Sequence, residues 1–102
     1  MSLRLYYRPS FKRSIKRLGY EQKKTVGLII ESLAVYYSRE CNLLEAQKIA
    51  PRFFYKQLRK PYYEAGIEGT IRVIIRREGE NCIVVLAGNH DQIKQFLASV
   101  QC

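Results

Sequence analysis

TIRVIIRREGENCIVVLAGNHDQ, residues Thr70–Gln92, is the stretch that decides the fold of this chain. Its first part alternates with the two-residue period of a β-strand, so Arg72 and Arg76, four positions apart, share one face. The polar segment 78–81 is typical of a tight hairpin turn. The apolar run CIVVLA then indicates an inner strand that is covered on both faces. A polar segment, GNHDQ, ends the stretch abruptly and holds His90, the only histidine of the chain.

The first third of the chain predicts a strand and two helices. Leu3–Arg8 alternates well enough for an opening strand, which Pro9 ends. Ser10 follows at the position of an N-cap, before a short helix that Gly19 closes. A stripe of apolar residues at helical spacing predicts a longer helix from about 20 to 37. We expect the two helices to form a helical hairpin.

The remaining segments are a weak helical turn at 42–50, two extended segments and a final helix. The aromatic residues of Arg52–Leu58 favour a strand, and Tyr62–Glu68 predicts a second one. A short helix is expected from Gln92 to Val100. The sequence therefore predicts one α+β domain over residues 1–102, in which the N-terminal strand and the helical hairpin pack on a small antiparallel sheet and a short helix ends the chain.

Length and composition limit the classes of protein to which the chain can belong. A length of 102 residues suits one domain, and a hydrophobic fraction of 47% argues against disorder. No apolar run approaches the roughly 20 residues that span a bilayer, and no secretory leader is evident. The three cysteines, Cys41, Cys82 and Cys102, lack CxxC spacing, and the chain has only one histidine. We therefore expect reduced thiols in the cytoplasm, and neither a metal nor a cofactor.

The charge of the chain is strongly positive. Eighteen lysines and arginines stand against nine acids, which gives a net charge of +9. All six charged residues between Leu3 and Glu21 are basic, namely Arg4, Arg8, Lys12, Arg13, Lys16 and Arg17. Such an excess favours binding to phosphates, to an anionic membrane surface or to an acidic protein. A small domain can also be basic for solubility alone.

The order of the elements, together with five short motifs, resembles the RelE/ParE superfamily of bacterial toxins from type II toxin–antitoxin modules. The motifs are PSFKRSIKRL at 9–18, LRKP at 58–61, YE at 63–64, IRVII at 71–75 and GNHDQ at 88–92. The resemblance covers nearly the whole chain and favours the RelE-like branch. It implies a cytoplasmic, ribosome-dependent mRNA endonuclease (an mRNA interferase) that uses no metal. It also implies a cognate antitoxin, mRNA and the ribosome as partners.

The resemblance also implies roles for particular residues. The implied reaction is attack by a ribose 2′-hydroxyl on the adjacent phosphate, which needs proton transfer and stabilisation of charge on the phosphorane. Arg72 matches the family's phosphate-clamping arginine, and a guanidinium can bind two phosphoryl oxygens at once. His90 falls where several RelE-like families place an acid or base, and histidine transfers protons readily at neutral pH. Glu64 is the third catalytic candidate, either as a base or as a structural partner of an arginine.

Two positions depart from the family pattern. Some members carry lysines on the strand before the arginine strand, at positions that match Glu64 and Gly66 here. A tyrosine often follows the polar stop, where this chain has only Lys94 and Phe96 nearby.

The predicted RNA contacts are the basic residues on the remaining segments, Lys56, Arg59, Lys60, Arg76, Lys94, Lys12, Arg13 and Lys16. The residues of the first helix could contact ribosomal RNA or receive an acidic antitoxin segment. Arg72 could instead form a surface salt bridge with Glu64 or Glu68. His90 could be a local helix-terminal residue with Asn89 or Asp91 as the cap.

Two other functions remain open from the sequence. A ParE-like protein inhibits DNA gyrase by binding and needs no acid–base residue, so the presence of His90 favours the endonuclease. A non-catalytic RelE-fold protein would act only as a binding partner of its antitoxin.

Overall fold

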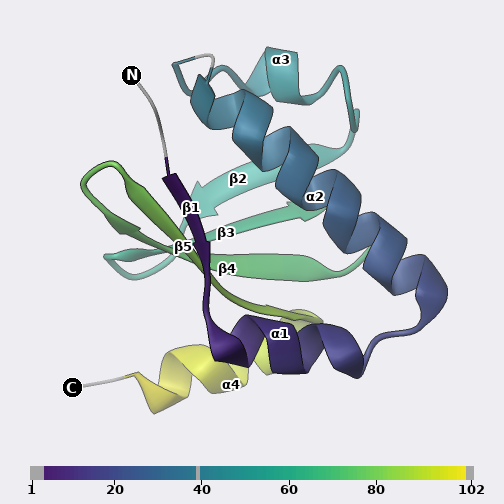
Figure 1. The fold of residues 1–102 in the computed structure, drawn as a ribbon, viewed down its shortest axis with the longest axis vertical. Helices are drawn as coiled ribbons and strands as arrows, with labels where there is room; N and C mark the ends of the chain where they lie inside the picture. Colours follow the sequence, from purple (N-terminus) through teal and green to yellow (C-terminus); the bar gives the residue numbers. More distant parts are fainter. Residues whose placement is uncertain (1–3, 39, 101–102) are drawn as a thin grey trace.

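The computed structural model describes residues 4–38 and 40–100. Along these residues the elements are β1 (Arg4–Tyr7), α1 (Pro9–Lys16), α2 (Tyr20–Ser38), α3 (Leu43–Ala46), β2 (Phe53–Gln57), β3 (Tyr62–Ile67), β4 (Arg72–Glu78), β5 (Asn81–Gly88) and α4 (His90–Ser99) (Figure 1). The α+β class and the order of elements are as predicted. Leu3, the first residue of the predicted opening strand, and Cys102 lie outside the described residues.

The strands form one sheet with the order β1-β5-β4-β3-β2. The pairs β2–β3, β3–β4 and β4–β5 are antiparallel, as predicted, whereas β1 pairs with β5 in parallel. The direction of β5 is set by its tight turn from β4, and β1 enters the sheet from the far end of the chain. The sheet is therefore mostly antiparallel, with β5 as an inner strand.

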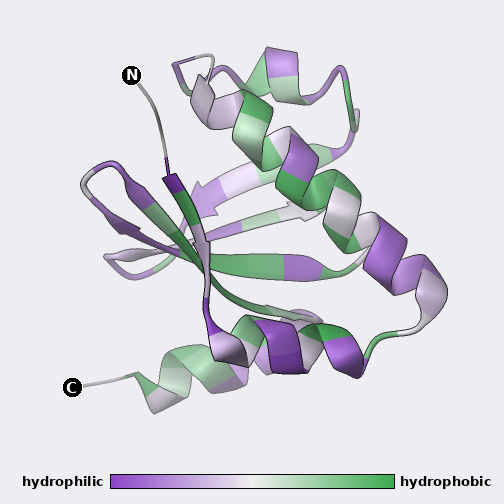
Figure 2. Cartoon of the chain, viewed as in Figure 1, coloured by the Kyte–Doolittle hydropathy of each residue, from purple (hydrophilic) through white to green (hydrophobic). Residues whose placement is uncertain are grey.

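Helices cover the two faces of the sheet unequally. α1 and α2, joined by a short turn, lie on one face, where Phe11, Ile29 and Leu33 pack with Val73 and Ile75 in the main core (Figure 1). α4 covers the other face, where Ile93 packs on Ile74 and Val85 in a smaller cluster. β4 and β5 contain long hydrophobic stretches, and α1 carries hydrophilic residues (Figure 2). The part of the second face that α4 leaves uncovered carries the candidate site.

The start of α1 differs from the prediction that Ser10 is its N-cap. The helix begins at Pro9, with Arg8 as the N-cap residue and no side-chain cap. Proline suits the first helical position because its missing N–H would have no helical partner there. The hydroxyl of Ser10 instead donates to the carbonyl of Val85 at 2.6 Å. Ser14 accepts from the amide of Ala87 at 3.1 Å, so two serines attach α1 to β5.

The decisive hairpin forms as the sequence predicts. β4 ends at Glu78 and β5 begins at Asn81, with Gly79 in the turn at φ 61°. Asn89 then caps α4, because its side chain accepts from the amide of Gln92 while the Gln92 side chain accepts from the Asn89 amide. The helix consequently begins two residues earlier than predicted, and His90 is its first residue.

None of the helices in the described part of the chain is both long enough and apolar enough to span a membrane.

Candidate nucleic-acid interface

Four of the predicted site residues come together on the face of the sheet that α4 partly covers. Arg72 lies at the start of β4 and Glu64 on β3, and the strand register places Lys56 of β2 directly opposite Glu64. Gly88, the last residue of β5, pairs with Arg72, and the Asn89 cap that follows brings His90 beside it. These residues are far apart in the sequence, and the pairing of three strands and the start of α4 bring them together.

Arg72 is held through a single nitrogen. Its Nη1 donates to Glu64 Oε2 at 2.9 Å and lies 3.2 Å from His90 Nδ1. A guanidinium can only donate, so His90 Nδ1 accepts in this arrangement and the neutral ring carries its proton on Nε2. The predicted alternative of a salt bridge to a neighbouring strand is thus also present, and its partner is Glu64.

Glu64 is buried between two cations. The residue is only 1% exposed, and its second oxygen, Oε1, lies 3.6 Å from Lys56 Nζ. Since both carboxylate oxygens face cations, Glu64 is better placed to orient Arg72 and Lys56 than to take a proton from a substrate. The two cations offset part of the cost of removing this carboxylate from water.

One edge of the Arg72 guanidinium forms no hydrogen bond with the part of the chain that the structure describes. Among the described residues, this side chain forms hydrogen bonds only through Nη1 and not through Nε or Nη2. The side chain is 25% exposed, so this edge is accessible to a ligand. The Nε–Nη2 edge matches the two oxygens of a phosphate or carboxylate.

Phe54 is a member of the site that sequence reasoning missed. The guanidinium carbon of Arg72 lies 5.5 Å from the centre of its ring, and Lys56 Nζ lies 6.0 Å from it. Phe54 and Lys56 are two residues apart on β2 and therefore share a face, which was visible in the sequence. The contact between Phe54 and Arg72 was not visible in the sequence, because it depends on the pairing of three strands.

The other predicted RNA contacts surround the site or lie away from it. Arg76 shares the Arg72 face, where it packs over the ring of Tyr62 and pairs with Glu78. Arg59 and Lys60 are exposed in the connection between β2 and β3, and Lys94 is exposed on α4. The three predicted residues of α1, on the opposite face of the sheet, are Lys12, Arg13 and Lys16.

Two cavities adjoin the Asn89 cap. One of about 380 Å³ is lined by the start of α2 and the β3–β4 connection, and one of about 250 Å³ lies between α1 and α4. Gln22 and Asn89 contribute to the lining of both. In the described ranges, no group of three or more histidine, cysteine, aspartate or glutamate side chains could hold a metal ion.

Comparison with known proteins relates the chain to toxins through its structure. No family model and no curated protein matches the sequence. A chain of the RelB–RelE antitoxin–toxin complex from Methanococcus jannaschii superimposes with a TM-score of 0.63 and 19% identity, covering 89% of this chain and 96% of that chain. A copper-bound mutant toxin from Helicobacter pylori superimposes with a TM-score of 0.64 and 17% identity, covering 90% of this chain and 99% of that chain. The chain therefore has the RelE-like toxin fold.

Proposed function

We propose that this protein is the toxin of a type II toxin–antitoxin module and that it cleaves mRNA on the ribosome without a metal. The observation that carries the proposal is the free Nε–Nη2 edge of Arg72 beside the neutral imidazole of His90. Arg72 can therefore bind a phosphate next to a histidine that can transfer a proton. The net charge of +9 and the fold that the chain shares with toxins are consistent with this function.

The proposed reaction begins with the scissile phosphate on the free edge of Arg72. Once the hydrogen bond from Arg72 Nη1 opens, His90 Nδ1 takes the proton of the ribose 2′-hydroxyl, whose oxygen attacks phosphorus. Arg72 and Lys56 stabilise the negative charge of the phosphorane. The bond from phosphorus to the 5′-oxygen then breaks, and the imidazolium returns the proton to that oxygen. The products are a 2′,3′-cyclic phosphate and a 5′-hydroxyl, so atoms and charges balance.

Lys56 compensates for the first departure from the family pattern. The lysines that some RelE-like toxins carry on the third strand are replaced here by Glu64 and Gly66. Lys56 brings an ammonium to the same face from the neighbouring strand and is placed there by Glu64. In the proposed mechanism the positive charge is therefore supplied by β2 and not by β3.

The test is induced expression followed by mapping of mRNA 5′ ends, with Arg72→Ala and His90→Ala compared to the wild type. Arg4→Ala is the matched control, because it removes the same charge from an exposed position on β1, which pairs with Asn81 at the end of β5 away from Gly88. We expect new 5′ ends within codons for the wild type and Arg4→Ala, and their loss in both site variants. Cleavage by Arg72→Ala at the wild-type level would contradict the mechanism. Growth arrest without new 5′ ends, together with inhibited DNA supercoiling, would support gyrase as the target.

We further propose an antitoxin partner with an acidic segment. The Methanococcus jannaschii relative was solved as a complex of antitoxin and toxin. In this chain α1 exposes basic side chains, which an acidic segment would neutralise as it folds on the surface. Co-expression of a short acidic open reading frame next to this gene is expected to relieve growth arrest. Arrest that persists although both proteins are present would contradict the partnership.

A further inference from the structure

The guanidinium in the candidate site lies over an aromatic ring across a glycine. Phe54 pairs with Gly66 in the β2–β3 register, and Gly66 pairs with Arg72 in the β3–β4 register. The three residues thus form one row across three strands. Because Gly66 has no side chain, the ring from β2 and the guanidinium from β4 meet above β3, at 5.5 Å from ring centre to guanidinium carbon.

An additional carbon at Gly66 would be crowded by both side chains. A Cβ at this position would lie 3.0 Å from Cε1 and Cζ of Phe54 and 3.2 Å from Cγ of Arg72. Contacts of this length require the neighbouring groups to shift by a few tenths of an ångström. An alanine at position 66 would therefore disturb the contact between the ring and the arginine, although the backbone there needs no unusual conformation.

The ring completes the orientation of the arginine. Two acceptors, Glu64 Oε2 and His90 Nδ1, fix only the Nη1 end of the guanidinium. Rotation about that end would move the free edge, and the contact with Phe54 opposes this rotation. A cation over an aromatic face is also attracted to it. The direction of the Nε–Nη2 edge thus depends on the ring.

We infer that Phe54 is a positioning residue, which fixes the plane of the Arg72 guanidinium for anion binding, and that Gly66 is the residue that permits this contact. The inference rests on the proposed function in one respect only, namely that the bound anion is a phosphate of RNA. The contact of Phe54 with Arg72 and its effect on anion binding can be tested with the free protein.

The first measurement is the NMR signal of the Arg72 Nε–Hε group, titrated with inorganic phosphate. In the wild type this proton is expected to carry a ring-current shift from Phe54, which Phe54→Leu abolishes, Phe54→Tyr retains and Gly66→Ala reduces. Because a cation–π contact is worth about 0.5–2 kcal/mol, phosphate binding should weaken by about 2- to 30-fold in Phe54→Leu. Phe54→Tyr should restore binding to the wild-type level.

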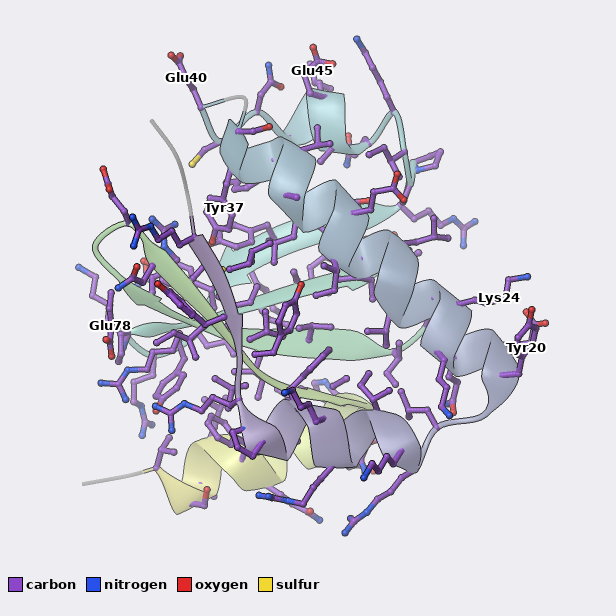
Figure 3. The ribbon with its side chains drawn as sticks, in the orientation of Figure 1. Tyr20, Lys24, Tyr37, Glu40, Glu45 and Glu78 are labelled. Carbon is purple, nitrogen blue, oxygen red and sulfur yellow. The ribbon has the colours of Figure 1, made fainter. Side chains whose placement is uncertain are left out.

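Two control variants match these changes outside the site. Tyr20→Leu removes another aromatic–cation pair, in which Lys24 Nζ lies 5.4 Å from the ring centre, at the exposed start of α2 (Figure 3). Gly27→Ala adds a methyl group on α2, where, apart from the chain neighbours and the backbone of the helix itself, none of the described residues has an atom within 4 Å of the new carbon. Both controls are expected to leave the Arg72 signal and phosphate binding unchanged.

The second measurement is the cleavage of mRNA on ribosomes, where Phe54→Leu should lower kcat by the same factor and change KM less. Circular dichroism establishes that each variant is folded. Loss of the ring-current shift with unchanged phosphate affinity would overturn the positioning role, as would failure of Phe54→Tyr to restore affinity. A wild-type protein that binds phosphate through Arg72 but does not cleave RNA would instead refute the proposed function and leave the role of Phe54 standing.

Discussion

The ion pairs of the site offer a quantitative prediction about which charges hold this face together. Glu64 contacts Arg72 at 2.9 Å and Lys56 at 3.6 Å, and a third pair on the same face, Arg76 with Glu78, is shorter at 2.6 Å. Distance alone would rank the Arg76–Glu78 pair as the strongest. Burial reverses this order, because water screens charges that it can reach.

The expected coupling energies follow from exposure. The side chain of Glu64 is 2% exposed and that of Arg72 is 25% exposed, so their charge-assisted hydrogen bond should contribute about 2 kcal/mol. The Lys56 side chain is 56% exposed, and its coupling to Glu64 should stay below about 1 kcal/mol. The Arg76 and Glu78 side chains are 36% and 46% exposed, and their coupling should also stay below about 1 kcal/mol. Figure 3 shows Glu78 at the outer surface of the molecule.

The assay is a double-mutant cycle for each pair, with Glu64→Gln, Arg72→Ala, Lys56→Ala, Arg76→Ala and Glu78→Gln. The free energy of unfolding is measured by urea denaturation, and the cycle isolates the pairwise contribution. Glutamine keeps the shape of glutamate and can still accept a hydrogen bond, which limits changes in packing. A coupling between Arg76 and Glu78 that equals or exceeds the coupling between Glu64 and Arg72 would refute the reasoning from burial.

Three further predictions concern stability. Asn89→Ala should lower the free energy of unfolding by about 1 kcal/mol in urea denaturation, because it removes the cap of α4, whereas Asn89→Asp should cost little. Burial raises the pKa of Cys82 from 9.0 to about 12 and that of Tyr55 from 10.0 to about 12. As the pH rises, the unfolded chain therefore loses these protons first, so the free energy of unfolding should fall between about pH 9 and pH 12. Cys82→Ala should make this fall shallower. An unchanged dependence of the free energy of unfolding on pH would contradict the role of Cys82. Gly79→Ala should destabilise the protein by about 1 kcal/mol, since φ is 61° there; a neutral result in the same denaturation assay would count against a left-handed residue in this turn.

Local patterns were sufficient to predict most of the elements. The alternation of apolar residues in 70–92 predicts the β4–β5 hairpin, and the apolar stripe at 20–37 predicts α2. A strand buries every second residue, whereas a helix buries residues with a period of 3.6, so the two patterns can be told apart in the sequence. The prediction for Ser10 was wrong because a serine can bond either to its own helix or to a neighbouring strand. Only the packing of α1 on β5 decides between these partners.

The candidate site was predicted in part. Arg72, Glu64, His90 and Lys56 were named from the sequence, and the structure brings all four together. The basic residues of α1 are separated from them by the sheet, which composition could not reveal. Net charge records how many cations a chain has and not which face they share.

The sequence by itself determined that this protein is a basic α+β domain with two arginines on one face of a strand, because charge and periodicity are local properties of the chain. Only the tertiary structure decided that Nη1 of Arg72 is occupied while its Nε–Nη2 edge has no hydrogen-bond partner among residues 4–38 and 40–100, and that Phe54 lies beside the guanidinium across Gly66. These contacts join residues on three strands and a helix start. Their geometry depends on strand register, which is set by turns and by core packing far from the residues themselves.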